Sequence, residues 1–571
     1  MISKGASDVN KSVAVGIQSY SQLISDKCFF IDKTLFIKDW WESNDNVTLI
    51  TRPRRFGKTL NMDMLDCFFS TKYANRSDLF EGMNIWNYEK YRKLQGTYPV
   101  IFLSFAEVKN PNLQEMKKNI SSIFYDVYAR YDSFFSDTEI MPEDSIRKYK
   151  DTKECLYNCS DENVIVKAIK RLSELFYNYY GKKAIILLDE YDTPLQEAWV
   201  GGFWDEAVSF MRLFFNSTFK TNEFMQRALM TGITRISKES LFSDLNNLKV
   251  CSMSSEQYQN YFGFSEEEVF AAMDELGYTN KDEVKYWYDG FTIGSAKDIY
   301  NPWSVINFLS EGNLKPYWAN TSSNALVSRL IREGDRKLKM DFEKLLNGET
   351  VLKTVDEELV FNQLDYDQNA VWSLLVTSGY LKINSINEDV YELQIVNHEV
   401  MLMFRKLIKE WFGRTADNYS DFIKCMLRCD VCEMNEYMNC ILESVVSSFD
   451  TAQNKSGFLA PEKFYHGLVL GLLVELRGRY LVQSNRESGF GRYDVMLIPE
   501  NKKEDKAFII EFKVVNRNRG ETSPEDALEN ALKQIEEKKY DRYLIDSGIS
   551  PDMIVKYGFA FEGKEVLIGR G

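Results

Sequence analysis

Four mostly apolar runs constrain the first half of the chain more than any other feature. They are Val47–Ile50, Tyr98–Phe105, Ala184–Leu188 and Ala228–Ile233, and helical stretches separate them. A strand that is apolar along its whole length is buried on both faces, which is typical of a parallel sheet covered by helices on each side. The runs therefore predict an α/β fold with a parallel sheet.

A basic, glycine-containing loop follows the first of these strands. The segment Arg52-Pro-Arg-Arg-Phe-Gly-Lys-Thr59 precedes a helical stretch, Leu60–Ser70. Backbone N–H groups at a helix start bind phosphate, a lysine such as Lys58 reaches the β- and γ-oxygens, and Thr59 can ligate Mg²⁺. Arg52 replaces the first glycine of the P-loop pattern, so we expect its side chain to point outward or the loop to enter by a different turn. The expected nucleotide-binding residues are Arg52, Arg55, Phe56, Gly57, Lys58, Thr59 and Leu60.

The strand at Ala184–Leu188 ends in two acids, which is the form of a Walker B segment. We expect Asp189 to hold Mg²⁺ and Glu190 to polarise the attacking water as a general base. The alternative is ordinary solvation of a strand end. The next strand ends in polar residues, of which Thr231, Thr234 and Arg235 are candidates to sense the γ-phosphate.

Near the C-terminus an acid and a lysine interrupt an apolar strand. Val495–Ile498 and Ala507–Val514 are predicted to form a hairpin joined by a polar loop. Side chains alternate between the faces of a strand, so Glu511 and Lys513 share one face. Asp494 begins the partner strand and can approach Glu511.

These three side chains are the parts of a metal-dependent hydrolytic site. Asp494 and Glu511 would bind Mg²⁺ or Mn²⁺, and Lys513 would position water or stabilise the charged phosphoryl transition state. The alternative is an exposed edge hairpin with an incidental salt bridge. Burying an acid and a lysine in an apolar strand is costly without a partner, which favours the metal site.

Two flanking helices could complete that site. The helix Pro524–Tyr540 carries Gln534, which could contact water or phosphate. The preceding helix, from about Glu462 to Gly478, carries Glu462 as a candidate further acid. His466 shares a face with Glu462 and is interpreted as a core histidine.

Charge and cysteine content limit the function classes. The formal net charge of −15 argues against non-specific coating of nucleic acid, so a nucleic-acid path needs a local basic groove. Nine cysteines without secreted-scaffold spacing indicate reduced thiols, and two histidines argue against a histidine-rich zinc site. We interpret Cys425, Cys429 and Cys432 as thiols on one amphipathic helix, Asp421–Val446, rather than as an iron–sulfur motif.

Features of a membrane or secreted protein are missing from the sequence pattern. No apolar run approaches the roughly 20 residues that a membrane helix needs. The polar segment Met1–Lys11 lacks the apolar region of a signal peptide. We therefore expect a cytoplasmic protein without a membrane partner, whose oligomeric state the sequence leaves open.

Taken together, the motifs resemble those of bacterial AAA-ATPase-like proteins with a C-terminal PD-(D/E)XK nuclease domain. The resemblance runs from Gly16 to about Tyr543 and rests on RPRRFGKT, LLDEYDTPL, TGITRISKESLFSDLNNL, WYDGF, YNPWS and SGFGRYD with EFK. It implies an ATPase core, a helical lid that holds YNPWS, and a restriction-endonuclease-like end domain. It also implies that Arg52 in place of glycine is usual, and that Gln534 matches a helix glutamine of the nuclease.

Four regions are expected along the chain. They are a P-loop ATPase core at 1–250, a helical lid at 251–335, a helical and winged-helix connector at 336–455, and a nuclease-like domain at 456–571. The winged-helix interpretation rests on helices followed by two short strands, Gly379–Ile383 and Tyr391–Ile395.

Three hypotheses follow for function. The first is an enzyme in which ATP binding and hydrolysis gate Mg²⁺-dependent cleavage of nucleic acid, with DNA the expected substrate. The second is a nucleotide switch whose end domain binds nucleic acid or protein without cutting. A small-molecule P-loop kinase fits worst, because it leaves the last hundred residues unexplained.

Overall fold

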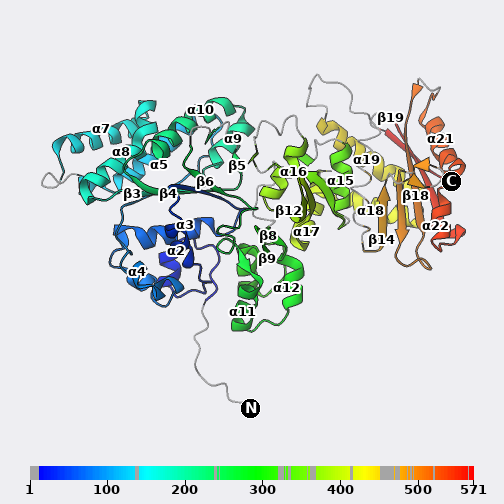
Figure 1. Ribbon diagram of the computed structural model, residues 1–571. Coiled ribbons are helices and arrows are strands. Elements are labelled where there is room, and N and C mark those ends of the chain that lie inside the picture. The colour runs from blue at the N-terminus through cyan, green and yellow to red at the C-terminus, as the bar shows by residue number, and fades with distance from the viewer. Residues whose placement is uncertain are drawn as a thin grey trace, which may run out of the picture. The chain divides into compact units, whose positions relative to one another are not determined.

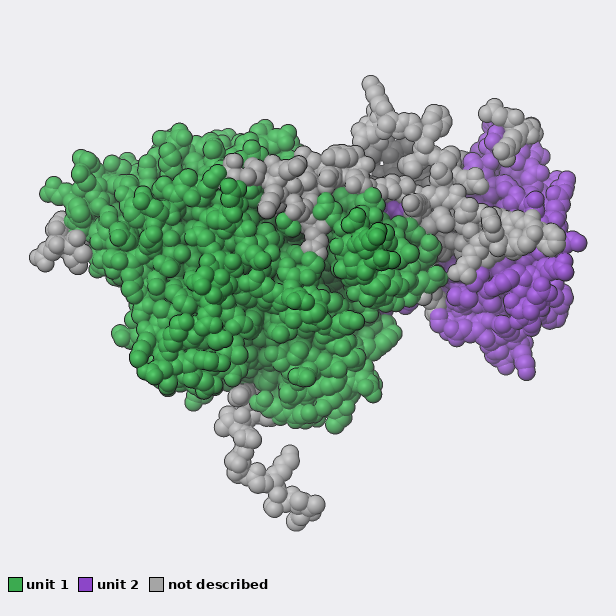
Figure 2. Space-filling model, viewed as in Figure 1, with its two compact units in different colours: residues 1–333, 341–401 green, residues 334–340, 402–571 purple. Residues whose placement is uncertain are grey.

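The computed structural model divides into two compact units (Figure 2). One comprises Met1–Glu333 and Asp341–Met401, and the other comprises Gly334–Met340 and Leu402–Gly571. The four regions expected from the sequence stay a prediction. The structure describes residues 12–135, 141–236, 241–242, 245–318, 327, 330–331, 336–346, 348–356, 358–359, 368–411, 416–449, 469, 473, 476, 478–484, 487–488, 491–492, 494–517, 521–562 and 565–571.

A five-stranded parallel sheet forms the centre of the first unit. Its strands are β1 (Val47–Thr51), β2 (Val100–Ser104), β3 (Ala184–Asp189), β4 (Met225–Gly232) and β6 (Leu248–Cys251). Their order is β2-β3-β4-β1-β6, and each neighbouring pair runs parallel. β1 and β3 are buried along their whole length, as unbroken apolar runs require. The predicted α/β class with a parallel sheet is confirmed.

Helices cover both faces of this sheet (Figure 1). α2 (Leu35–Glu42) and α3 (Lys58–Phe69) lie on one face, and α5 (Leu113–Ala129), α8 (Glu162–Tyr180) and α10 (Trp204–Phe215) lie on the other. Each of these helices turns an apolar side to the strands. The carboxyl ends of the strands stay open to the loops that follow them, and those loops hold the first candidate site.

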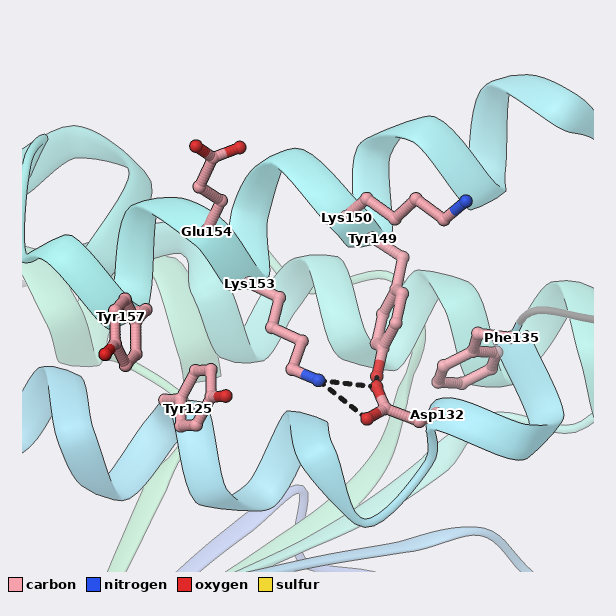
Figure 3. Close-up of a pocket in the computed structure, with 8 residues that line it drawn as sticks. All are labelled: Tyr125, Asp132, Phe135, Tyr149, Lys150, Lys153, Glu154 and Tyr157. Carbon is pink, nitrogen blue, oxygen red and sulfur yellow. Dashed lines mark hydrogen bonds and ion pairs between the residues drawn. The ribbon is translucent and has the colours of Figure 1, made fainter.

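The helices between β2 and β3 border an open hollow of about 500 Å³ (Figure 3). It lies between α5 and α7 (Glu143–Asn158). Lys153 Nζ lies 2.7 Å from Asp132 Oδ2, and Tyr149 donates its hydroxyl to the same carboxylate. The lining consists of Tyr125, Asp132, Phe135, Tyr149, Lys150, Lys153, Glu154 and Tyr157.

The region expected to be a helical lid also contains a small sheet. The strands β7 (Phe264–Ser265), β9 (Ala296–Tyr300) and β8 (Phe291–Ile293) pair antiparallel in that order. Glycines with φ of +123° at Gly290 and +57° at Gly294 make the bends around β8. The helices around this sheet are α11 (Glu266–Leu276), α12 (Lys281–Tyr288) and α13 (Pro302–Glu311).

The connector contains the two strands that the sequence predicts. β12 (Leu381–Asn387) and β13 (Val390–Ile395) form a hairpin, and β10 (Val351–Thr354) pairs with β13. The helices beside them are α15 (Arg336–Leu346), α16 (Gln368–Thr377) and α17 (His398–Trp411). The winged-helix interpretation of this region stays a prediction.

The single helix expected over Asp421–Val446 is wrong. The chain forms α18 (Ala416–Arg428) and α19 (Val431–Phe449), and Cys429 between them has φ of +66°. A left-handed residue cannot continue a right-handed helix, so the chain turns there. Cys425 is buried, whereas Cys432 is exposed, and both thiols are free.

The second unit is built on a mixed five-stranded sheet. Its strands are β14 (Tyr480–Ser484), β17 (Val495–Pro499), β18 (Ala507–Val514), β19 (Ile554–Glu562) and β20 (Glu565–Arg570), in that order across the sheet. β18 and β19 run parallel and the other pairs antiparallel. One face packs against α18 and α19, and the other against α21 (Pro524–Glu537). The predicted hairpin is therefore β17 with β18.

Two asparagines of α19 close the edge of this sheet at β20. Asn435 Nδ2 donates to the Ile568 carbonyl at 2.9 Å, and its Oδ1 accepts from the Ile568 N–H at 2.7 Å. Asn439 makes the same two bonds to Val566, both at 2.9 Å. The helix thus supplies the donors and acceptors that a sixth strand would otherwise provide.

Candidate nucleotide and metal sites

The loop between β1 and α3 has the geometry that a phosphate site needs. Two residues lie in the left-handed region, Arg55 with φ of +67° and Gly57 with φ of +78°. Gly57 is the N-cap of α3, so the unpaired N–H groups of the first helical turn face the end of the sheet. The sequence folds this way because a glycine tolerates the positive φ at the helix start.

The Lys58 side chain lies inside the loop and hydrogen-bonds to its backbone. Its Nζ donates to the carbonyl oxygens of Arg52 at 2.9 Å and Pro53 at 2.8 Å. Burial lowers the pKa of Lys58, against the attraction of nearby carboxylates, Glu190 foremost. A buried ammonium is a strong ligand for phosphate oxygens because little water competes for it.

Arg52 does not point outward, which corrects that alternative. Its side chain is fully buried, and Nη1 donates to the carbonyls of Thr51 (2.8 Å), Cys251 (3.0 Å) and Ser252 (2.7 Å). The guanidinium thus joins the end of β1 to the end of β6. Phe56 is also buried and packs edge-on against Phe291 at 4.8 Å.

The remaining loop residues lie on the surface and at the helix base. Arg55 is exposed, and its guanidinium lies 4.2 Å from the Trp303 ring centre. Leu60 is partly buried against the core of the sheet.

Asp189 at the end of β3 connects the two halves of the site. Thr59 donates its hydroxyl to Asp189 Oδ2 at 2.6 Å, and Thr231 at the end of β4 donates to Oδ1. Burial raises the pKa of Asp189, and the two hydroxyl donors oppose that rise. A hydroxyl and a carboxylate in contact offer the oxygen ligands that Mg²⁺ prefers, so these residues fit the ion.

Glu190 follows Asp189 in a strained backbone conformation. Its φ is +52°, and its Oε2 accepts a hydrogen bond from the Thr193 hydroxyl at 3.1 Å. The carboxylate is partly exposed, so water can reach it. A non-glycine residue with positive φ is uncommon, and such strain is concentrated at functional sites.

Sequence reasoning missed Asp192, the third acid of this segment. It is fully buried, and its Oδ2 accepts from the N–H of Ile233 (3.0 Å), the N–H of Thr234 (2.9 Å) and the Thr234 hydroxyl (2.8 Å). Thr234 therefore bonds to Asp192, whereas Thr231 reaches Asp189. Arg235 lies just beyond, in β5 (Arg235–Ile236). The sequence feature that could have indicated this residue is the second aspartate of DEYD, which is Asp192 itself.

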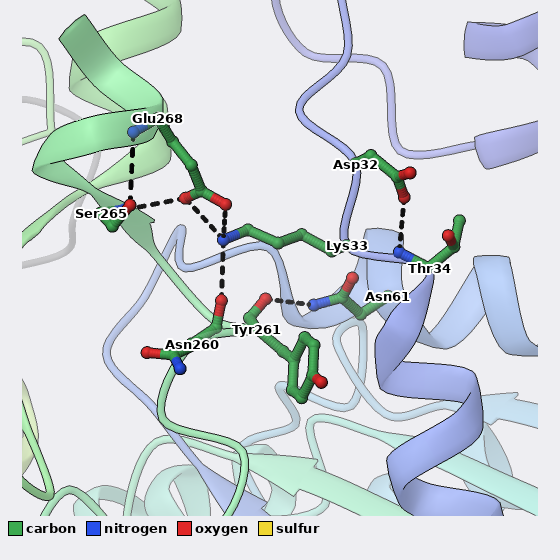
Figure 4. Close-up of polar contacts among 8 residues, drawn as sticks. All are labelled: Asp32, Lys33, Thr34, Asn61, Asn260, Tyr261, Ser265 and Glu268. Atoms are coloured by element: carbon green, nitrogen blue, oxygen red, sulfur yellow. Dashed lines mark hydrogen bonds and ion pairs between the residues drawn. The ribbon is translucent and has the colours of Figure 1, made fainter. Parts of the chain in front are cut away.

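Contacts on the other side of α3 were also missed (Figure 4). Lys33 is buried and donates to Glu268 at 2.6 Å and to the Asn260 carbonyl at 2.7 Å. Asn61 of α3 donates to the Tyr261 carbonyl at 2.9 Å. The helix that begins at the phosphate loop is thereby fixed to the segment that follows β6.

In the second unit, Glu511 is an acid inside an apolar strand. It is 1% exposed, and its Oε1 receives Gln534 Nε2 and Lys513 Nζ, the latter at 3.4 Å. Its Oε2 is buried and has no hydrogen-bond partner among the residues that the structure describes. Burial, and then the nearby charge of Asp494, raises the pKa of Glu511 to about 8.

Asp494 lies beside Glu511 through the pairing of β17 with β18. Val495 is opposite Ile510, and Asp494 Oδ2 accepts the Phe512 N–H at 2.8 Å. The structure thus brings together Asp494, Glu511, Lys513 and Gln534. An unpartnered carboxylate oxygen beside a second acid fits a divalent cation.

Two further residues bear on this site. Tyr540 was missed by the sequence reasoning, and its hydroxyl lies 3.3 Å from Gln534 Nε2. The only sequence feature that could have indicated Tyr540 is its position shortly after the helix that carries Gln534. Glu462, the candidate further acid, lies outside the described residues, as does His466.

Comparisons with known proteins identify two domains in the chain. Residues 14–242 match a family model described as a predicted AAA-ATPase, and residues 460–571 match the model of the PD-(D/E)XK nuclease superfamily. A protein described as an uncharacterized protein in the vnfD 5′ region of Azotobacter chroococcum mcd 1 is 23% identical over 554 residues. That alignment covers 93% of this chain and 94% of the relative.

A solved structure, that of Drosophila ORC bound to AT-rich DNA and Cdc6, also matches. The match covers 68% of this chain and 93% of that chain at 10% identity, with a TM-score of 0.18, which is too low to support an inference. None of the described helices has both the length and the apolar character needed to cross a bilayer. By its family matches, the chain combines a predicted AAA-ATPase domain with a C-terminal domain of the PD-(D/E)XK nuclease superfamily.

Proposed function

We propose that this protein binds and hydrolyses ATP and, with Mg²⁺, cleaves phosphodiester bonds in nucleic acid, with DNA as the substrate. Nucleotide state gates the cleavage. The protein acts in the cytoplasm, and Mn²⁺ can replace Mg²⁺ at the nuclease site. The two family matches support the two activities, and the side chains of each site supply the chemistry.

At the first site, the residues of the phosphate loop bind the triphosphate. The N–H groups at the start of α3 and the Lys58 ammonium contact the phosphate oxygens. Thr59 and Asp189 would hold Mg²⁺, which neutralises charge on the phosphates. Glu190 orients and polarises the attacking water, and Thr231 keeps Asp189 in place.

At the second site, Asp494 and Glu511 would hold the metal, which supplies charge stabilisation and an activated water. Lys513 stabilises the developing negative charge on the phosphate. Gln534 fixes the orientation of the Glu511 carboxylate through its donated hydrogen bond. Metal binding requires Glu511 to lose its proton, so the ion and the proton compete for the same oxygens.

The observation that carries the nuclease proposal is the unpartnered Glu511 Oε2. A buried carboxylate oxygen without a donor costs roughly 1–3 kcal/mol or more. That cost is offset if a cation occupies the position during function. An incidental salt bridge would instead be exposed and would satisfy both oxygens.

A cleavage assay tests the proposal. Supercoiled, linear and single-stranded DNA, and RNA, are incubated with Mg²⁺ or Mn²⁺, with and without ATP. We expect Asp494→Asn to reduce cutting by about 100-fold or more, since the metal site loses a charged ligand. Asp505→Asn is the matched control, because Asp505 lies in the loop of the same hairpin and pairs only with Arg479 among the described residues.

ATP hydrolysis is measured on the same preparations. Lys58→Ala should abolish it, and Lys182→Ala, a surface lysine that contacts the Thr97 carbonyl, should not. A wild-type protein that binds ATP and DNA but cuts no substrate under any condition would replace the nuclease proposal with the switch. Cutting that persists in Asp494→Asn would disprove the assigned site.

A further inference from the structure

The carbonyl groups of the phosphate loop need donors on the side away from the nucleotide. A loop whose N–H groups face a phosphate turns its carbonyls outward, and a buried carbonyl without a donor is costly. Lys58 satisfies the carbonyls of Arg52 and Pro53. The carbonyl of Arg54 is satisfied from a different part of the chain.

Two side chains from the segment after β9 donate to the Arg54 carbonyl. Trp318 Nε1 lies 3.1 Å from that oxygen, and Asn301 Nδ2 lies 3.4 Å from it. Both residues are 1% exposed. More than 240 positions separate them from Arg54 in sequence, so no local folding rule places them there.

Trp318 is itself held in place by a buried acid. Its backbone N–H donates to Glu399 Oε1 at 2.5 Å, and Ser304 donates its hydroxyl to Glu399 Oε2 at 2.8 Å. The indole packs between Phe291 and Tyr380, with ring centres at 6.1 and 5.5 Å. The indole N–H therefore has little freedom to leave the Arg54 carbonyl.

Asn301 has two separate tasks. Its Oδ1 caps α13 by accepting from the N–H of Trp303 at 2.9 Å and of Ser304 at 3.4 Å. Its amide nitrogen is then directed to the Arg54 carbonyl. A serine at this position would keep the cap and lose the donor, so the two tasks can be separated by mutation.

We propose that Trp318 and Asn301 are positioning residues for nucleotide binding. They hold the peptide between Arg54 and Arg55 with its carbonyl outward, which leaves its N–H directed toward the phosphates. They touch no phosphate themselves. This inference rests on the proposed nucleotide site. It adds that side chains from the region after β9 fix the conformation of the phosphate loop.

Titration of nucleotide binding in the full-length chain tests it. Trp318→Phe, Asn301→Ser and the double variant are titrated with ATP and with inorganic tripolyphosphate, which reports on the phosphate loop alone. Each single variant leaves one donor on the carbonyl, so we expect its Kd to rise only about threefold. The double variant removes both side-chain donors from the Arg54 carbonyl, and its Kd for both ligands should rise by at least about tenfold, more than the product of the singles.

The controls separate positioning from general loss of stability. Trp372→Phe removes the same indole from another buried position of this unit, and its Kd should equal that of the wild type. Circular dichroism fixes a temperature at which all variants are folded. The kcat for ATP hydrolysis at saturation should stay within about twofold of wild type, because Asp189 and Glu190 are unchanged.

Failure of the nucleotide site and failure of the positioning role give different results. Wild-type protein that binds neither ATP nor tripolyphosphate refutes the proposed nucleotide site. If the wild type binds and the folded double variant binds equally well, or Trp372→Phe weakens binding as much as the double variant, the positioning role is refuted and the nucleotide site stands.

Discussion

Glu511 links pH to the stability of the second unit. Its pKa is raised from 4.5 to about 8 by burial and by Asp494, so the folded state binds the proton more tightly than the unfolded chain. Metal-free protein should therefore lose stability as pH rises from about 4.5 through 8. Glu511→Gln removes this ionisation and should be more stable than wild type at pH 8 in chelator, but not below pH 4.5.

Magnesium should reverse that order. The wild type gains stability from the ion and Glu511→Gln does not, because the amide carries no charge to offer it. The measurement is the midpoint of thermal unfolding of the C-terminal transition at pH 4.5 and 8, with Mg²⁺ or chelator. Equal destabilisation of the variant at both pH values would contradict the titration argument and indicate a packing effect.

Some side chains of the sites could be placed from the sequence, and others could not. The two-residue period of a strand put Glu511 and Lys513 on one face, and the structure has Phe512 in the core on the other face. The inward course of Arg52 depends on carbonyls at Cys251 and Ser252, about 200 positions away, which no local pattern reveals.

The pair α19 and β20 gives a prediction about a helix and the sheet edge it protects. Alanine has a higher helix propensity than asparagine, so Asn435→Ala with Asn439→Ala would stabilise an isolated helix. In the protein the double variant should instead lose about 2–4 kcal/mol, because four hydrogen bonds to β20 disappear. Thermal unfolding measures the loss, and light scattering should detect association through the freed strand edge.

The control for this pair is Asn163→Ala, an exposed asparagine in α8. It should leave stability unchanged within about 0.5 kcal/mol, as surface substitutions usually do. A double variant as stable and as monodisperse as wild type would show that β20 needs no cover.

Apolar strands of four or more residues were largely predictable as elements, and the three-residue strand β8 was not. β1 and β3 are buried on both faces, so their sequences are mostly apolar. β8 has only three residues, and its aromatic neighbours also suit helices. The break between α18 and α19 depends on the left-handed φ of Cys429, and a cysteine gives no warning of that conformation.

The division into two units predicts two thermal transitions for the intact chain. Each unit has its own sheet and core, so each should unfold cooperatively. ATP at 100 times its Kd should stabilise the first transition by about 2.7 kcal/mol, and Mg²⁺ alone should raise the second. Scanning calorimetry measures both, with Lys58→Ala and Glu511→Gln as variants that each lose one response. A single transition raised by either ligand would show that the units unfold together.

The position of β4 between β1 and β3 fixes how far apart two catalytic elements can be. Adjacent strands are about 4.8 Å apart, so the backbones that lead to Thr59 and Asp189 are separated by roughly 10 Å. Main-chain hydrogen bonding sets this separation. Substitutions can change the side chains that lie between the two strands more easily than they can change the distance between the backbones. The sheet therefore sets the distance between the two backbones. Selection among cations must come from the side chains that extend into the space between them from the ends of β1 and β3.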